Sequence, residues 1–115
     1  MHDKLYSVAV LPGDGIGPEV VEAALPVFDV IDVKFDFRFG SIGWECWRAN
    51  GDPIPQETWN IVRETDVTLL GAITSKPERE SKEELLPGID PKLHTYISPV
   101  VQLRQKLNLT TNRRP

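Results

Sequence analysis

The chain has 115 residues, of which 40% are hydrophobic and 26% are charged, and its formal net charge is −4. This length and apolar share suit one small globular domain and exclude an intrinsically disordered chain. The negative charge argues against a nucleic-acid surface, and the lack of an apolar run of about 18 residues argues against a membrane span.

The first part of the chain predicts two strands with a helix between them. Residues 5–11 form an apolar run that ends in a glycine-rich turn, which is typical of a buried strand in a parallel sheet. Pro18 suits the first turn of a helix, and apolar spacing continues this helix, with a kink or break expected at Pro26. Residues 33–39 alternate between apolar and polar, so they predict a half-buried strand with every second side chain facing inward.

The second part repeats this order with a long polar interruption. Residues 40–51 contain two tryptophans at helical spacing and suggest a short helix. Helical spacing recurs over 56–64, and 66–72 is a further apolar strand. Residues 76–84 suit either a solvated helix or a mobile loop. Ser98 followed by Pro99 predicts a helix to about residue 107, with the serine as N-cap.

Residues 13–17 read Gly-Asp-Gly-Ile-Gly, which invites comparison with a dinucleotide-binding turn. The third glycine stands at the fifth position and not at the sixth, so the Rossmann fingerprint is not met. The spacing favours a structural turn over a phosphate contact. The alternation of strands and helices predicts a parallel α/β sheet, and ligands of such sheets bind at the carboxyl ends of the strands.

Arginines in the last part of the sequence form a candidate anion site. Arg104 lies on the last predicted helix, and Arg113 and Arg114 follow on a strand-like segment, where adjacent side chains point to opposite sides. Only one of this pair can therefore join Arg104 in binding a carboxylate as a planar fork. The alternative for Arg104 is a surface position along the helix. No spacing in the sequence matches a zinc site, a Ser/His/Asp set or a P-loop.

Cys46 and His94 have plainer interpretations. Cys46 is the sole cysteine, and we interpret it as a small buried side chain and not as a reactive thiol. His94 is isolated in the polar interruption and is not assigned to a ligand or catalytic role. Without an internal disulfide or an apolar leader after Met1, the sequence suggests a cytoplasmic location.

Four segments resemble one enzyme family. Residues 8–20, reading Val-Ala-Val-Leu-Pro-Gly-Asp-Gly-Ile-Gly-Pro-Glu-Val, resemble the opening of the β-decarboxylating dehydrogenases. These are the isocitrate, 3-isopropylmalate, homoisocitrate and tartrate dehydrogenases. Residues 51–55, 70–74, and 103–105 followed by 112–115, resemble further segments of the family in the same order. The resemblance covers essentially the whole chain but only the first third of a typical member.

The resemblance implies a fold and a domain plan. The fold would be the α/β/α sandwich of the isocitrate/isopropylmalate dehydrogenases, which is not a Rossmann fold. Residues 1–115 would form the N-terminal part of the large α/β domain, with residues 98–115 leading toward the second domain. The remainder of the family fold is expected beyond Pro115.

The resemblance also implies a reaction and a set of contacts. Members oxidise and decarboxylate a 3-substituted (2R)-malate with NAD or NADP and with Mg²⁺ or Mn²⁺, and they act as homodimers. By resemblance, the substrate contacts would be Arg104, Arg114, Ser98 and Val100. The cofactor contacts would be Ile16 toward the adenosine part, and Ile73, Thr74 and Ser75 beside the nicotinamide.

The resemblance places the catalytic tyrosine and lysine, a third arginine and the metal-binding aspartates after Pro115. No catalytic residue and no metal ligand is assigned within this chain, which alone is expected to be inactive. Arg113, Thr110 and Thr111 depart from the more apolar residues that the family usually has at these positions.

The substrate assignment depends on the segment Ile97-Ser98-Pro99-Val100-Val101. It is more similar to homoisocitrate and archaeal-type members than to isopropylmalate enzymes, so isocitrate or homoisocitrate ranks slightly ahead of 3-isopropylmalate. NAD and NADP are not distinguished. Two alternatives stay open: a truncated, non-catalytic relative acting as a binding or regulatory partner, and an α/β domain with an unrelated ligand.

Overall fold

The computed structural model describes residues 5–109 and contains one parallel sheet. Its strands are β1 (Leu5–Gly13), β2 (Lys34–Phe39) and β3 (Val67–Ala72), in the order β2-β1-β3. Val8 of β1 pairs with Phe37 on one side and with Val67 on the other. The predicted parallel sheet is thus confirmed, with the first strand at its centre.

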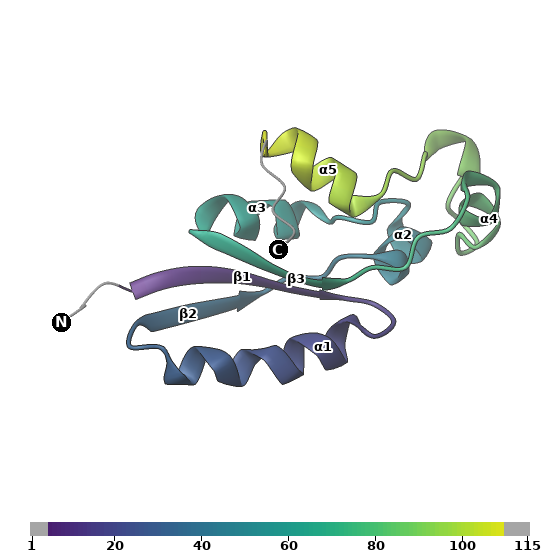
Figure 1. Ribbon diagram of the computed structural model, residues 1–115. Coiled ribbons are helices and arrows are strands. Elements are labelled where there is room, and N and C mark those ends of the chain that lie inside the picture. Colours follow the sequence, from purple (N-terminus) through teal and green to yellow (C-terminus); the bar gives the residue numbers. More distant parts are fainter. Residues whose placement is uncertain (1–4, 110–115) are drawn as a thin grey trace.

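Helices cover both faces of this sheet (Figure 1). Helix α1 (Gly17–Ala24) lies on one face, while α3 (Gln56–Glu64) and α5 (Pro99–Lys106) lie on the other. The remaining helical segments are η1 (Leu25–Val30), α2 (Trp44–Asn50), α4 (Glu78–Glu83) and η2 (Pro91–Leu93). Among the described residues, no helix is long and apolar enough to cross a membrane.

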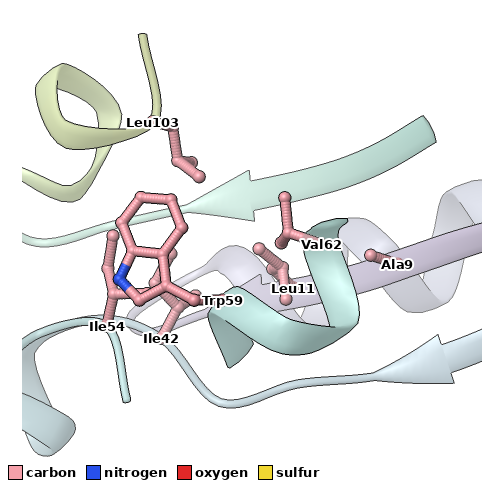
Figure 2. Close-up of a cluster of buried hydrophobic side chains, with 7 residues drawn as sticks. All are labelled: Ala9, Leu11, Ile42, Ile54, Trp59, Val62 and Leu103. Carbon is pink, nitrogen blue, oxygen red and sulfur yellow. The ribbon is translucent and has the colours of Figure 1, made fainter. Parts of the chain in front are cut away.

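The central strand supplies both halves of the core because its side chains alternate between the two faces. Val8 and Val10 pack with Val21 of α1. Ala9 and Leu11 face α3 and α5 (Figure 2). The second cluster consists of Ala9, Leu11, Ile42, Ile54, Trp59, Val62 and Leu103. Burial on both faces explains why the strand reads as a continuous apolar run.

Several element boundaries match the sequence predictions, whereas the predicted inward orientation of one side chain of β2 does not. Helix α3 has the predicted bounds, and the helix that starts at Gly17 changes from α to 3₁₀ at Leu25, beside Pro26, as expected. Helix α4 confirms the helical alternative for the polar segment. Phe39 was predicted to face inward on β2 but is 60% exposed, because it stands at the end of an edge strand.

Candidate functional site

The loops that follow the three strands converge on Asp14. Its Oδ1 accepts a hydrogen bond from the Thr74 N–H after β3 at 2.6 Å, and its Oδ2 accepts one from the Trp44 N–H after β2 at 2.6 Å. The Asp14 N–H donates to the carbonyl oxygen of Ala72 at 2.9 Å. One half-buried residue therefore joins the carboxyl ends of all three strands, the edge at which α/β sheets bind ligands.

The predicted cofactor residues divide into exposed and packed groups. Ile16, in the glycine loop, is 67% exposed, and Thr74 and Ser75 are exposed as well. The two loops touch, because a Cβ built on Gly15 would lie 3.4 Å from Oγ1 of Thr74. Ile73 instead packs against the buried cluster on the α3 side. The structure thus brings the glycine loop, which carries Ile16, to the Thr74–Ser75 loop, whereas Ile73 packs toward the core.

The glycine loop also has a packing function. A Cβ on Gly17 would overlap the carbonyl oxygen of Pro12, so only glycine allows α1 to start so close to the end of β1. The Gly17 N–H donates to the Asp14 carbonyl oxygen at 2.9 Å, which closes the turn. These contacts support the structural interpretation of the turn that the glycine spacing favoured.

The predicted substrate residues lie on α5 and before it. Val100 and Arg104 line the same pocket of about 200 Å³ between α5 and β3. Its other lining residues are Thr68, Leu70, Leu103, Leu107 and Leu109. Arg104 is exposed, and its neighbours in the pocket are mainly apolar. The same pocket therefore offers one cation and an apolar wall.

Of the two remaining predicted substrate residues, the structure describes Ser98 but not Arg114. Ser98 is the N-cap residue of α5, as predicted, although its side chain makes no capping hydrogen bond. Pro99 stands at the first position of the helix, where a residue without an N–H is favoured, so the helix starts there without a hydrogen bond from the Ser98 hydroxyl. Arg114, with Thr110, Thr111 and Arg113, lies outside the described residues.

The Thr74–Ser75 loop is supported on its outer side by an aromatic cluster. The Tyr96 ring packs edge-on against Trp44 and Trp47, with centroids 5.1 and 5.3 Å apart. The Tyr96 hydroxyl lies 2.9 Å from Oγ of Ser75. Burial raises the pKa of Tyr96, and the Asp14 charge acts in the same direction, so this hydroxyl stays protonated over the physiological range.

A surface ion pair completes this support. Glu84 accepts hydrogen bonds from Nζ of Lys76 at 2.8 Å and from Nε1 of Trp44 at 3.2 Å. These two donors lower the pKa of the Glu84 carboxyl, with the Lys76 bond as the main cause. The predicted cofactor loop is consequently held between Asp14 on its inner side and the Tyr96 and Glu84 groups on its outer side.

Asp14 and Tyr96 are the residues that sequence reasoning missed. Asp14 showed no partner at regular spacing, because its partners are 30 and 60 residues away. Its position between two glycines was a usable signal, since a short acidic side chain in a tight turn readily accepts backbone N–H groups. Tyr96 gave no such signal.

Cys46 and His94 follow their plainer interpretations in part. Cys46 is half-buried and not fully buried, and burial raises the pKa of its thiol, with the charge of Asp52 adding to the effect. A raised pKa disfavours the reactive thiolate. His94 packs against the ring of Trp47, where Gly51 leaves room for it.

The described residues fit the two implied ligands differently. No group of three His, Cys, Asp or Glu side chains within residues 5–109 is arranged to hold a metal ion, so no step is assigned to a metal here. For a dinucleotide, the exposed Ile16 in the glycine loop and the exposed Thr74 and Ser75 in the adjoining loop provide an apolar group and polar groups at the carboxyl edge of the sheet. This arrangement suits a cofactor that has both an apolar ring and polar substituents.

Known proteins are similar to this chain in sequence and in fold. Protein DlpA of Legionella pneumophila (strain Philadelphia 1) is 55% identical over 94% of this chain, which corresponds to 18% of DlpA. The 3-isopropylmalate dehydrogenase of Aquifex aeolicus is 42% identical over 97% of the chain and 29% of the enzyme. The apo crystal structure of a β-decarboxylating dehydrogenase from Thermococcus kodakarensis superposes with a TM-score of 0.70 at 35% identity, covering 90% of this chain and 27% of that one.

The chain thus spans less than a third of the length of these relatives. The family model described as isocitrate/isopropylmalate dehydrogenase matches residues 7–115. Together with the shared fold, this match confirms the resemblance seen in the sequence: the chain belongs to the isocitrate/isopropylmalate dehydrogenase family.

Proposed function

We propose that this chain forms the substrate-carboxylate and cofactor-loop part of an NAD(P)-dependent dehydrogenase that oxidatively decarboxylates a 3-substituted (2R)-malate. The observation that carries the proposal is the pocket shared by Val100 and Arg104 beside β3. A guanidinium group next to an apolar wall suits an acid with a carboxylate at one end and a variable substituent at the other.

Within this proposal, Arg104 binds a carboxylate of the substrate, and Arg114 supplies a second guanidinium. Ser98 and Val100 meet the substituent at C3. Ile16, Ile73, Thr74 and Ser75 form the cofactor side, with Ile73 acting from the core by supporting its loop. When bound, the nicotinamide accepts the hydride, and the tasks of this chain are to bind and orient the two reactants.

We propose that the metal ligands and the proton-transfer groups lie in the remainder of the enzyme, and that the enzyme is a dimer. We propose that residues 1–115 are the N-terminal part of its large domain and that residues 98–115 lead toward a second domain. Mg²⁺ or Mn²⁺ would then bind to side chains after Pro115 in a cytoplasmic homodimer. The family membership of residues 7–115 supports this plan.

Substrate choice is the finer part of the proposal. Ser98 offers a hydroxyl that is not used for capping and is suited to a third carboxylate, which favours isocitrate or homoisocitrate. The 42% identity to a 3-isopropylmalate dehydrogenase favours a substrate with an apolar substituent, as does Val100. Isocitrate, homoisocitrate and 3-isopropylmalate are therefore the acids to compare.

The test is an absorbance assay of NAD(P)H formation by the polypeptide as its source cell makes it, with magnesium and each of the three acids. Turnover of one acid at least tenfold faster than of the others would assign the substrate. No turnover with any acid and either cofactor would contradict the dehydrogenase proposal.

The match to DlpA, whose printed name gives no reaction, leaves a second function open. In this alternative the chain belongs to a non-catalytic relative that acts as a binding or regulatory partner. The intact mass of the natural polypeptide separates the two proposals in combination with the assay. A mass near 13.0 kDa, without turnover, would favour the alternative.

A further inference from the structure

Asp14 uses both oxygens of its carboxylate to hold backbone groups from two other loops. Oδ1 accepts from the Thr74 N–H and Oδ2 accepts from the Trp44 N–H, each at 2.6 Å. A charged acceptor makes such bonds shorter and stronger than a neutral one. The two N–H groups belong to segments that follow different strands, so the carboxylate fixes these segments relative to each other.

The backbone around Asp14 extends this fixation to Ile16. The Asp14 carbonyl oxygen accepts from the Gly17 N–H at 2.9 Å, and Gly15 has a φ of +59° that glycine adopts without strain. Ile16 lies between these two glycines and is 67% exposed. The backbone position of Ile16 relative to Thr74 is therefore set through Asp14, which itself is half-buried.

We propose that Asp14 is a positioning residue, whose carboxylate sets the spacing between Ile16 and Thr74 and so determines the shape of the dinucleotide-binding surface without contacting the dinucleotide. This inference rests on the proposed function, and it deepens it by naming the residue that couples the two sides of the cofactor surface. The competing interpretation is that Asp14 only stabilises the fold.

Asp66 provides a matched control for that competing interpretation. Its Oδ2 accepts from the Ser7 N–H at 2.9 Å and from the Ser7 hydroxyl at 3.3 Å. Asp66 thus also joins segments about sixty residues apart, but at the amino ends of β1 and β3. A purely structural effect should appear in both aspartates, whereas a positioning effect on the cofactor should appear only in Asp14.

The variants are Asp14→Asn and Asp66→Ala in the polypeptide as its source cell makes it, because both Ser7 groups donate to one oxygen of Asp66 and only alanine removes both bonds. An asparagine at residue 14 keeps one acceptor oxygen but directs its NH₂ group at the other backbone N–H, so one of the two loops is released. We expect the Kd for NAD(P)H, measured by fluorescence, to rise about tenfold in Asp14→Asn and to stay within about twofold in Asp66→Ala. The KM for the acid should change far less than the KM for the cofactor.

Equal weakening in both variants, or no weakening in Asp14→Asn, would overturn the positioning role. Wild-type protein that binds NAD(P)H but turns over no acid would contradict the proposed reaction and leave the positioning role supported if the variants differ as expected. Wild-type protein that binds no NAD(P)H would overturn both.

Two measurements keep the test decisive if Asp14→Asn does not fold. Asp14→Ser retains a single short acceptor and is expected to show the same selective loss of cofactor binding. In the wild type, amide hydrogen exchange should show the Thr74 and Trp44 N–H groups protected compared with the Ser75 N–H. Fast exchange at both amides would overturn the proposal, because the fixed spacing depends on these two bonds.

Discussion

The hydroxyl group of Tyr96 lies 2.9 Å from Oγ of Ser75, and it donates to the carbonyl oxygen of Thr74 at 3.3 Å. Tyr96 stands two residues before Ser98, the proposed substrate residue at the start of α5. A single side chain therefore links the segment assigned to the cofactor with the segment assigned to the substrate. Asp14 reaches the same loop from the opposite side.

Replacing Tyr96 with phenylalanine should remove this link while keeping the ring contacts with Trp44 and Trp47. We expect the free energy of unfolding to fall by about 1 kcal/mol, the usual net value of such hydrogen bonds. Denaturant unfolding of both proteins measures this difference. Tryptophan fluorescence should change little, because both tryptophans keep their aromatic neighbour.

The pH dependence of this difference follows from the raised pKa of Tyr96. The unfolded chain loses the Tyr96 proton near pH 10, and the folded chain loses it at a higher pH. The advantage of the wild type over Tyr96→Phe is thus complete below about pH 10 and decreases as the pH rises further. A constant difference up to pH 11 would contradict the assignment.

Glu84 should make stability sensitive to acid. Its pKa is lowered in the folded chain, mainly by the bond from Lys76, from an ordinary value of 4.5. Its contribution is therefore present above that value and is lost as the pH falls through the lowered pKa. Unfolding of wild type and Glu84→Gln at pH 6 and pH 3 should show the difference shrinking at pH 3. Glu83→Gln, which removes only an exposed pair with Arg79, is the control and should lower the free energy of unfolding little at pH 6.

Gly71→Ala tests the close approach at the carboxyl end of the sheet. A Cβ on Gly71 would overlap the Pro12 carbonyl oxygen, which belongs to the neighbouring strand and has little freedom to move. We expect a loss of about 1–3 kcal/mol in the free energy of unfolding, as for other overpacked sites. Gly88→Ala is the control, because a Cβ there meets nothing within 4 Å and only its φ of +98° is unfavourable. A loss below about 0.5 kcal/mol for Gly71→Ala, the usual range of surface substitutions, would show that the crowding is relieved cheaply.

Arg104→Lys tests the proposed substrate contact. Lysine keeps the charge but not the planar fork, so we expect kcat/KM for the preferred acid to fall about thirtyfold, equivalent to about 2 kcal/mol. Arg79→Lys is the matched control, since Arg79 is 91% exposed on α4. Unchanged kinetics in Arg104→Lys would favour the interpretation of Arg104 as a surface side chain.

Ser98→Ala should separate substrate choice from stability. Because the Ser98 side chain makes no capping bond, its removal should change the free energy of unfolding by less than about 0.5 kcal/mol. If the hydroxyl contacts a third carboxylate, the ratio of kcat/KM for isocitrate to that for 3-isopropylmalate should fall. An unchanged ratio would remove Ser98 from the set of specificity residues.

The strands and most helices were predictable because each carries a local signal. The apolar run of β1, the helical spacing of α3 and the proline at the start of α5 all act within a few residues. The exposure of Phe39 was not predictable, because it depends on which strand lies at the edge of the sheet. The alternation in β2 is the same whether or not a helix covers its end.

The candidate site residues were proposed mainly through the resemblance and less through the residues themselves. Physical reasoning placed ligands at the carboxyl ends of the strands, but it did not find Asp14, whose partners are remote in sequence and belong to the backbone. A hydrogen bond donated by a backbone N–H group cannot be predicted from the pattern of side chains in the sequence. The missing capping bond of Ser98 was not predictable either, because a proline at the next position is compatible with a capping and with a non-capping serine side chain.

The strand order β2-β1-β3 has a consequence for synthesis on the ribosome. The central strand is made first, and its last neighbour is complete only at Ala72. At the usual rate of about 5–20 residues per second, the apolar segment Val8–Leu11 waits several seconds for its second partner. During that time its backbone groups and side chains are open to other chains. The segment Val8–Leu11 is therefore expected to bind chaperones during synthesis until β3 has been made.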